Sequence, residues 1–284
     1  MRRRTLLRLS LEVELAVAPS ATLEAALIEP VLKNALFVHG TIPSPYDAIV
    51  KELAGQQQVS RDRKASRRRA MLRKARKLVG DVESLLETLP SALDAITAAE
   101  QEVGSSDDML PVRAALAIGG SISSPRLVFL LSFVRGCPAE QVDCGADPSS
   151  SHIDKARRKL VRTLMTHCGD LGNVNTGLSR LHLLLQAPQA ACLPPPFQPR
   201  PAFRLKLQRA HACRVHFESM RPPSAVVDAS CDGPSTLHCM LDRVGAPIDG
   251  FQWAEQDSDE GGVGTICSRI WFHATNSAVR GFGL

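Results

Sequence analysis

The chain reads SRRRAMLRKARKLVGDVESLLETL over residues 66–89, and this stretch has its strongest helical periodicity. Apolar residues recur there at steps of three and four, which places them on one face of a helix and leaves the other face charged. Pro90 follows directly and should end or bend the helix, because proline lacks the backbone N–H that an interior position donates. The stretch therefore predicts a long amphipathic helix over about 66–89.

Two other segments have helical periodicity. In residues 20–38 apolar side chains recur at every fourth position. In residues 152–171 one apolar stripe is surrounded by arginine and lysine side chains. The basic side of this third helix is a candidate contact face.

The remaining apolar segments favour strands. Residues 7–17 alternate between apolar and polar side chains, as expected of a half-buried strand. Beyond Pro196 the pattern becomes strand-like, so three helices are combined with a strand-rich C-terminal half, which is an α+β pattern. The further strand candidates are Val112 to Ile118, Leu127 to Val134, Phe203 to Leu207, Cys213 to Phe217, Leu237 to Leu241 and Thr265 to Ala274.

Positive charge is concentrated in one run. Residues 61–77 hold ten Lys or Arg and one acid, Asp62, whereas the whole chain has a net charge of +5. Such a run is typical of a nuclear-import or polyanion-binding patch, and equally of a solvated helix face. Nucleic-acid binding as the main function is disfavoured, because none of the twelve aromatic residues lies in the run to stack on bases. The import patch assigned to this run consists of Arg67, Arg68, Arg69, Arg73, Lys74, Arg76 and Lys77.

Several classes of protein are excluded by the sequence. Its apolar runs are far shorter than the roughly 20 residues of a membrane-spanning helix. The eight cysteines include no C-x-x-C pair, so a reducing compartment is expected. Arg8, Glu12 and Glu14 interrupt the apolar region that a secretory signal would need, while a mitochondrial transit peptide is less firmly excluded.

No catalytic constellation is recognisable, and no cofactor or metal site is expected. Gly119 and Gly120 follow an apolar strand without a phosphate-loop or hydrolase motif, which favours a tight turn. His211, Cys213 and His216, together with His238 and Cys239, have the chemistry of zinc ligands, but alternation along a strand would point His216 away from Cys213. The residues therefore give no evidence of an enzyme.

Four segments, taken in chain order, carry a specific resemblance. They are Leu32-Lys33 with Ile42-Pro43-Ser44-Pro45-Tyr46, Leu110-Pro111-Val112-Arg113 with Gly119-Gly120-Ser121-Ile122-Ser123-Ser124-Pro125, Arg157-Arg158-Lys159-Leu160, and Ile270-Trp271-Phe272-His273-Ala274 with Arg280-Gly281-Phe282. Together they resemble the comet family, adaptors that bind the mitotic-arrest-deficient-two checkpoint protein. The matches span almost the whole chain, although identity between them is low, and the last segment is the most specific.

The resemblance implies a HORMA-like fold, in which three helices pack on an antiparallel sheet with a C-terminal belt region. A single domain over residues 1–284 is expected, with mobile loops at about 135–150, 186–200 and 255–264. The family has no known catalysis. Its members bind a closed-state HORMA checkpoint protein by mimicking that protein's dimer partner, and they present it to a hexameric AAA+ ATPase for remodelling.

The resemblance also implies two contact surfaces. Two interface positions of the family, a Gln and a Phe in animal members, fall on Val38 and Val161, and a valine is a weaker anchor than a large aromatic side chain. The ATPase-docking segment is similar to Phe197-Gln198-Pro199-Arg200, which assigns docking to Pro199 and Arg200. The residues assigned to the HORMA partner are Val38, Arg157, Arg158, Val161, Arg162 and Met165.

The expected protein is thus a non-enzymatic adaptor that silences the spindle assembly checkpoint. Its expected partners are the closed mitotic-arrest-deficient-two protein or a meiotic HORMA protein, and the AAA+ ATPase, with no membrane partner and with nucleic acid disfavoured as a partner. The expected location is the nucleus and, during division, the kinetochore or spindle and the cytoplasm. The alternative is a basic nuclear nucleic-acid-binding protein that acts through Arg61 to Lys77 and whose affinity falls steeply with salt.

Overall fold

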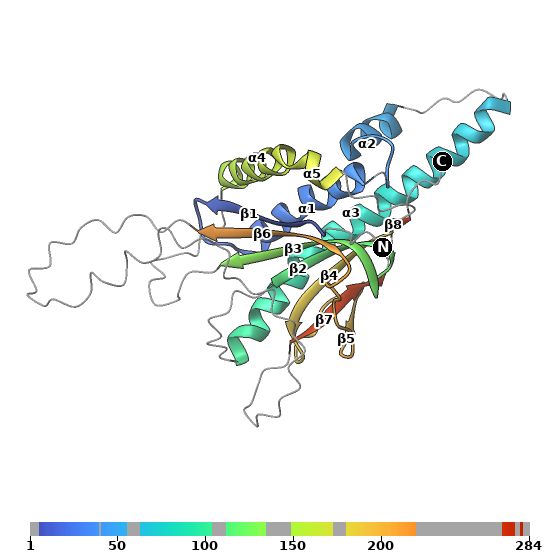
Figure 1. Cartoon of the computed structure of the whole chain (residues 1–284). Coiled ribbons are helices and arrows are strands. Elements are labelled where there is room, and N and C mark those ends of the chain that lie inside the picture. Colours follow the sequence, from blue (N-terminus) through green and yellow to red (C-terminus); the bar gives the residue numbers. More distant parts are fainter. Residues whose placement is uncertain are drawn as a thin grey trace, which may run out of the picture. The chain divides into compact units, whose positions relative to one another are not determined.

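The computed structural model describes residues 6–39, 41–55, 63–103, 112–134, 149–172, 180–219, 269–275 and 279–280 (Figure 1). These residues form a mixed α+β structure, so the predicted fold class is confirmed at that level. The helices are α1 (Ala21–Val38), α2 (Tyr46–Gly55), α3 (Arg63–Val103), α4 (Ser150–Thr166) and α5 (Cys168–Gly172). The strands are β1 (Arg8–Leu15), β2 (Val112–Ser121), β3 (Ser124–Val134), β4 (Arg180–Pro188), β5 (Phe197–Arg200), β6 (His211–Ser219), β7 (Arg269–Ala274) and β8 (Val279–Arg280).

The strands form one mixed sheet in the order β1-β6-β3-β2-β4-β7-β5, and β8 pairs with the start of β4. β6 runs parallel to both of its neighbours, β1 and β3, whereas the other neighbouring pairs are antiparallel. The expectation of an antiparallel sheet is therefore wrong. β6 comes late in the chain and lies between two earlier strands, and the direction of such a non-local insertion is not encoded in apolar alternation.

The helices pack on one face of the sheet, as Figure 1 shows for α1, α3 and α4. One apolar core joins the buried side chains of these helices to the strand residues that face them. α1 begins after Ser20, whose hydroxyl accepts the backbone N–H of Leu23 at 3.3 Å, and this bond caps the helix. The helix predicted over 20–38 is confirmed.

The helix predicted over 66–89 is longer than expected, since α3 runs from Arg63 to Val103 and passes through Pro90. Beyond the proline the apolar stripe continues, and Leu93 and Ile96 are fully buried. Burial of each such side chain contributes about 1.5–3 kcal/mol, which offsets the one hydrogen bond that proline removes. For this reason α3 does not end at Pro90.

The carboxyl end of α3 is fixed to the sheet by Glu100. Its carboxylate forms ion pairs with Arg113 of β2 and with Arg269 at the start of β7. Arg113 is only 2% exposed, and a buried cation left without its counter-charge would cost several kcal/mol. Glu100 therefore joins a long helix, a central strand and a C-terminal strand.

β2 and β3 form a hairpin in which Ser121 pairs with Ser124. Gly119 lies at a bulge where a Cβ would come within 2.9 Å of the Ser124 carbonyl oxygen. A tight turn was expected in Gly119–Ser123 with glycine at positive φ. The turn is found at Ile122 and Ser123, but both glycines lie in β2 and neither has a positive φ. Gly119 is needed at the bulge for space, because only a residue without a side chain permits so close an approach.

The opposite face of the sheet is covered in part by residues 201–210. Phe203, Leu205 and Leu207 do not form the predicted strand and instead pack against a second apolar cluster that includes Val128. Arg8 donates to the Leu207 carbonyl oxygen at 2.7 Å and holds this segment in place. Its alternation thus reflects packing over a sheet face.

The predicted loops have different outcomes. Residues 135–148 and 255–264 lie outside the described residues, as does the strand candidate over 237–241. Within 186–200, β4 continues to Pro188 and residues 197–200 form β5, so this segment is not a mobile loop throughout. The single domain stays a prediction, because residues 220–268 are not described.

Candidate partner-binding face

α4 packs against α1 and against β1, the strand at one edge of the sheet (Figure 1). Leu160 and Leu164, one turn apart, are buried in the core. Lys159 Nζ lies 2.7 Å from the Glu14 carboxylate of β1. The helix predicted over 152–171 is therefore found as two helices, α4 and the short α5, with His167 between them.

The outer side of α4 carries four of the six residues predicted to bind the HORMA partner. Val161 and Met165 are 43% and 60% exposed, and the side chains of Arg158 and Arg162 are exposed beside them. Because residues three, four and seven apart share one side of a helix, these four form a single surface, called here the α4 stripe. Methionine and arginine are enriched at protein interfaces, which agrees with a contact role.

Arg157 does not belong to the α4 stripe, because it is paired within the molecule. Its guanidinium lies 2.8 Å from the Glu29 carboxylate of α1. Glu29 also lies 2.8 Å from Lys33 Nζ, and Lys33 in turn lies 3.0 Å from Asp47 of α2. This chain of ion pairs links α4, α1 and α2, so Arg157 fixes the position of α4.

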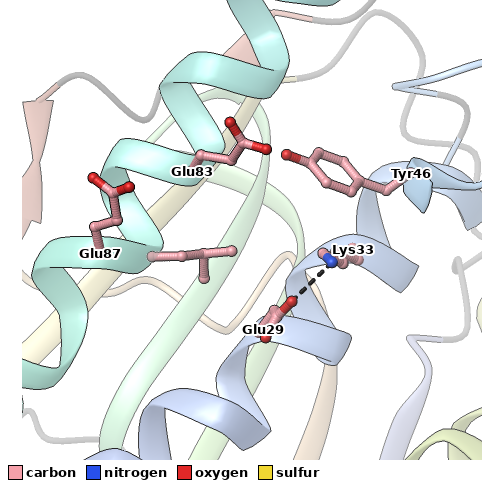
Figure 2. Close-up of a pocket in the computed structure, with 6 residues that line it drawn as sticks. Glu29, Lys33, Tyr46, Glu83 and Glu87 are labelled. Atoms are coloured by element: carbon pink, nitrogen blue, oxygen red, sulfur yellow. Dashed lines mark ion pairs between the residues drawn. The ribbon is translucent and has the colours of Figure 1, made fainter. Parts of the chain in front are cut away.

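A pocket of about 470 Å³ lies beside these ion pairs, between α1, α2 and α3 (Figure 2). The Tyr46 hydroxyl donates to the Val79 carbonyl oxygen at 3.3 Å, and Lys33 Nζ lies 4.8 Å from the centre of the Tyr46 ring. Burial, together with the carboxylate of Glu83, raises the pKa of Tyr46. Figure 2 shows Tyr46 and Glu83 pointing toward one another across the pocket. The Pro-Ser-Pro-Tyr turn thus begins α2 and fastens it to α3.

Val38, the fifth predicted contact residue, ends α1 and is half-buried near Gly172 of α5. Phe37, one position earlier, is 41% exposed. Sequence reasoning missed Phe37, although the four-residue apolar spacing of α1 leaves it off the core stripe and so signals its exposure. Since α1 contacts both α4 and α5, Phe37 places an exposed aromatic ring on the helix to which α4 is fastened.

Pro199 and Arg200, the predicted ATPase-docking residues, lie on β5 with exposed side chains. β5 is the edge strand at the opposite end of the sheet order from β1, and among the described strands it pairs only with β7. Proline suits such an edge because it has no backbone N–H to donate to a further strand. Six strand spacings separate the two edges, which corresponds to about 29 Å along the sheet.

The predicted import patch lies on α3. Four of its seven side chains are described, and all four are exposed: Arg73, Lys74, Arg76 and Lys77. Residues 67–69 belong to the same helix, and their side chains lie outside the described part.

The candidate zinc ligands of β6 are not brought together. Cys213 lies in the helix-facing core, and His216 is on the opposite side of the strand. His211 Nδ1 accepts the Leu7 backbone N–H at 2.9 Å. Burial raises the pKa of Cys213 to about 12, so its thiol stays protonated. The described residues contain no group of three or more metal-ligating side chains. His238 and Cys239 lie outside the described residues.

Comparison with known proteins does not supply a relative. The chain matches no protein-family model and no curated protein. Within the part of the chain that the structure describes, no helix is both long enough and apolar enough to cross a membrane. Its function is therefore inferred from the α4 stripe, from β5 and from the resemblance of the four segments.

Proposed function

We propose that this protein is a non-enzymatic adaptor of the comet type, which binds a closed-state HORMA checkpoint protein and presents it to a hexameric AAA+ ATPase. In this role it silences the spindle assembly checkpoint or acts on a meiotic HORMA protein. The fold is then HORMA-like, β7 and β8 belong to a C-terminal belt, and the basic residues of α3 direct the protein to the nucleus.

The observation that carries the proposal is the placement of two exposed surfaces at opposite edges of one sheet. The α4 stripe lies over the β1 edge, and Pro199 with Arg200 forms part of the β5 edge. An adaptor has to hold its cargo and reach the ATPase at the same time. Two surfaces on opposite edges meet this requirement, because occupation of one leaves the other accessible.

The chemistry of each surface suits its proposed partner. The α4 stripe combines two exposed apolar side chains with two arginines, and arginine is among the side chains in which interface energy concentrates. Phe37 is added as a candidate contact, since it supplies the aromatic anchor that Val161 lacks. On β5, Pro199 restrains the backbone, which lowers the ordering cost of binding, and Arg200 is a long cation suited to an acidic docking patch.

The proposal is tested by separating the two surfaces in a reconstituted assay. Pro199→Ala combined with Arg200→Glu should preserve binding to the closed HORMA protein and abolish its ATPase-dependent conversion to the open form. Both side chains are exposed at a sheet edge, so the fold should be retained.

A matched control is Pro201→Ala combined with Arg204→Glu, which makes the same chemical changes at exposed positions outside β5. This control should convert the partner as the unmodified protein does. Unchanged conversion by the β5 variant would move the docking site elsewhere, and loss of partner binding by the same variant would show that the two surfaces are not separate.

A further inference from the structure

The amino-terminal part of α3 is a cationic helix. Between Arg63, where the helix begins, and Gly80 the sequence holds nine Lys or Arg and no Asp or Glu. The first acidic residue on this helix is Asp81. Net charge of one sign over so long a stretch produces a strong local potential that attracts polyanions.

The described cations of this segment are directed away from the core. Arg73, Arg76 and Lys77 are exposed, and about 100° of rotation per residue turns each of them by at least about 100° away from Ala75 and Leu78, which are buried. Within the described residues none of these three cations forms an ion pair. The charge is therefore available to an external partner.

The segment continues a helix that is anchored in the core, although its outer turns pack little. Val82 and Leu85, further along α3, are almost completely buried, so the helix is anchored in the core from its middle onward. Before Ala75 no described side chain of α3 is buried, and Met71 is 48% exposed. Figure 1 shows these first turns standing apart from the labelled strands. The cations are thus presented on a preformed helix, which lowers the entropic cost of binding.

We propose that this amino-terminal part of α3 binds the phosphate backbones of duplex nucleic acid. This is a further activity that does not depend on the adaptor role. An α-helix of about 10–12 Å diameter fits the major groove of a duplex, which is about 12 Å wide. Cations on such a helix then lie near phosphates, which supply most of the affinity of binding without sequence preference.

Duplex nucleic acid fits this surface better than a single strand does. Proteins that bind single strands combine cations with aromatic side chains on which unpaired bases stack. The sequence from Arg63 to Gly80 contains no Phe, Trp or Tyr. Contacts to phosphates need no aromatic partner, so the composition of the helix selects for a paired duplex.

The test measures binding of the full chain to a random-sequence DNA duplex by fluorescence anisotropy over a range of salt concentrations. In the binding variant Arg73, Lys74, Arg76 and Lys77 are replaced by Gln, a comparable helix former. If all four contact phosphates, the slope of log affinity against log salt should become shallower by about 3 to 4, since each contact contributes about 0.9. Circular dichroism checks that the helix content is unchanged.

The control variant removes the same charge elsewhere. Lys51, Arg204, Lys206 and Arg209 are exposed outside α3, and their replacement by Gln lowers the net charge equally. This variant should bind the duplex with the slope of the unmodified protein. If the slope of log affinity against log salt became equally shallow in the two variants, the proposal would be overturned, because net charge alone would then explain the binding. Tighter binding of a single strand, or equally tight binding of polyglutamate, would also overturn the assignment to a duplex.

Discussion

Val161 and Met165 are the exposed apolar side chains of the α4 stripe, and they decide whether this face is an interface. Val161→Glu places a carboxylate where a bound partner would exclude water. Burial of this carboxylate without a counter-ion reduces the binding free energy by several kcal/mol. The affinity for the closed HORMA protein should therefore fall at least about 100-fold. Calorimetric titration of the closed partner measures the change.

Met71→Glu is the matched control for this substitution. Met71 is also a large exposed apolar residue, but it lies on α3, away from the α4 stripe. Its replacement should leave the affinity for the closed partner unchanged. A folded Val161→Glu protein that binds as well as the Met71→Glu control would show that α4 is not the interface.

Two histidines, the buried His273 and the half-buried His216, make stability depend on pH. Burial lowers the pKa of His216 and of His273 to about 4, and the charges of Arg214 and His182, respectively, act in the same direction. In the unfolded chain a histidine titrates near pH 6.5, so between about pH 6.5 and 4 the unfolded state binds more protons. Stability is therefore complete above pH 6.5 and is lost as the pH falls through this window.

The expected loss between pH 7 and pH 5 is about 1 to 2 kcal/mol for each histidine, measured as the free energy of unfolding in urea. Replacing His216 and His273 by Gln should flatten this pH dependence, whatever the stability of the variant at pH 7. If the variant lost stability as steeply as the unmodified protein between pH 7 and pH 5, other groups would be responsible.

Glu29 holds the elements of the candidate interface together, because its carboxylate joins α1 to α4 through Arg157 and to α2 through Lys33. Glu29→Gln leaves two partly buried cations without this partner. The free energy of unfolding should fall by about 1 to 2 kcal/mol. Binding of the HORMA partner should also weaken, because α4 would no longer be fixed against α1.

The control for this element is Glu14→Gln, which removes the more exposed ion pair between β1 and Lys159 of α4. An exposed ion pair contributes about 0.2–1 kcal/mol, so Glu14→Gln should lower the free energy of unfolding less than Glu29→Gln does. Similar losses of stability for Glu14→Gln and Glu29→Gln in urea titrations would mean that Glu29 has no special role in holding α4.

How far the elements could be predicted depends on how local their signals are. The apolar stripes of α1, α3 and α4 recur within a few turns, and they indicated these helices from sequence alone. The extension of α3 past Pro90 was not foreseen, because it depends on the burial of Leu93 and Ile96 by the rest of the fold. The parallel insertion of β6 between β1 and β3 is likewise a non-local pairing that alternation does not specify.

The residues of the candidate site also divide into those that the sequence could predict and those that it could not. The resemblance, not spacing, assigned Arg158, Val161, Arg162 and Met165 to the HORMA partner, and the structure places these four on one exposed stripe. The pairing of Arg157 with Glu29 could not be read from spacing, because the two residues lie on different helices far apart in the chain. The exposure of Phe37 had a signal in its position off the apolar stripe, but burial was needed to establish it.

At the scale of the whole molecule, one sheet separates the two proposed contact surfaces. α4 covers the β1 edge, and β5 forms the other edge. The two proposed partners therefore bind at different edges, the HORMA protein at the β1 edge and the ATPase at the β5 edge. Substitutions at either edge should affect one activity and spare the other, as tested by the Pro199 and Arg200 variant.

The central claim is that the chain recognises the closed state of a HORMA checkpoint protein. The most direct measurement is calorimetric titration of the purified full chain with forms of that protein locked in the closed state and in the open state. We predict binding of the closed form with one-to-one stoichiometry, and no binding of the open form at the same concentrations. Equal affinity for the two forms, or no binding of the closed form of either a mitotic or a meiotic partner, would contradict it.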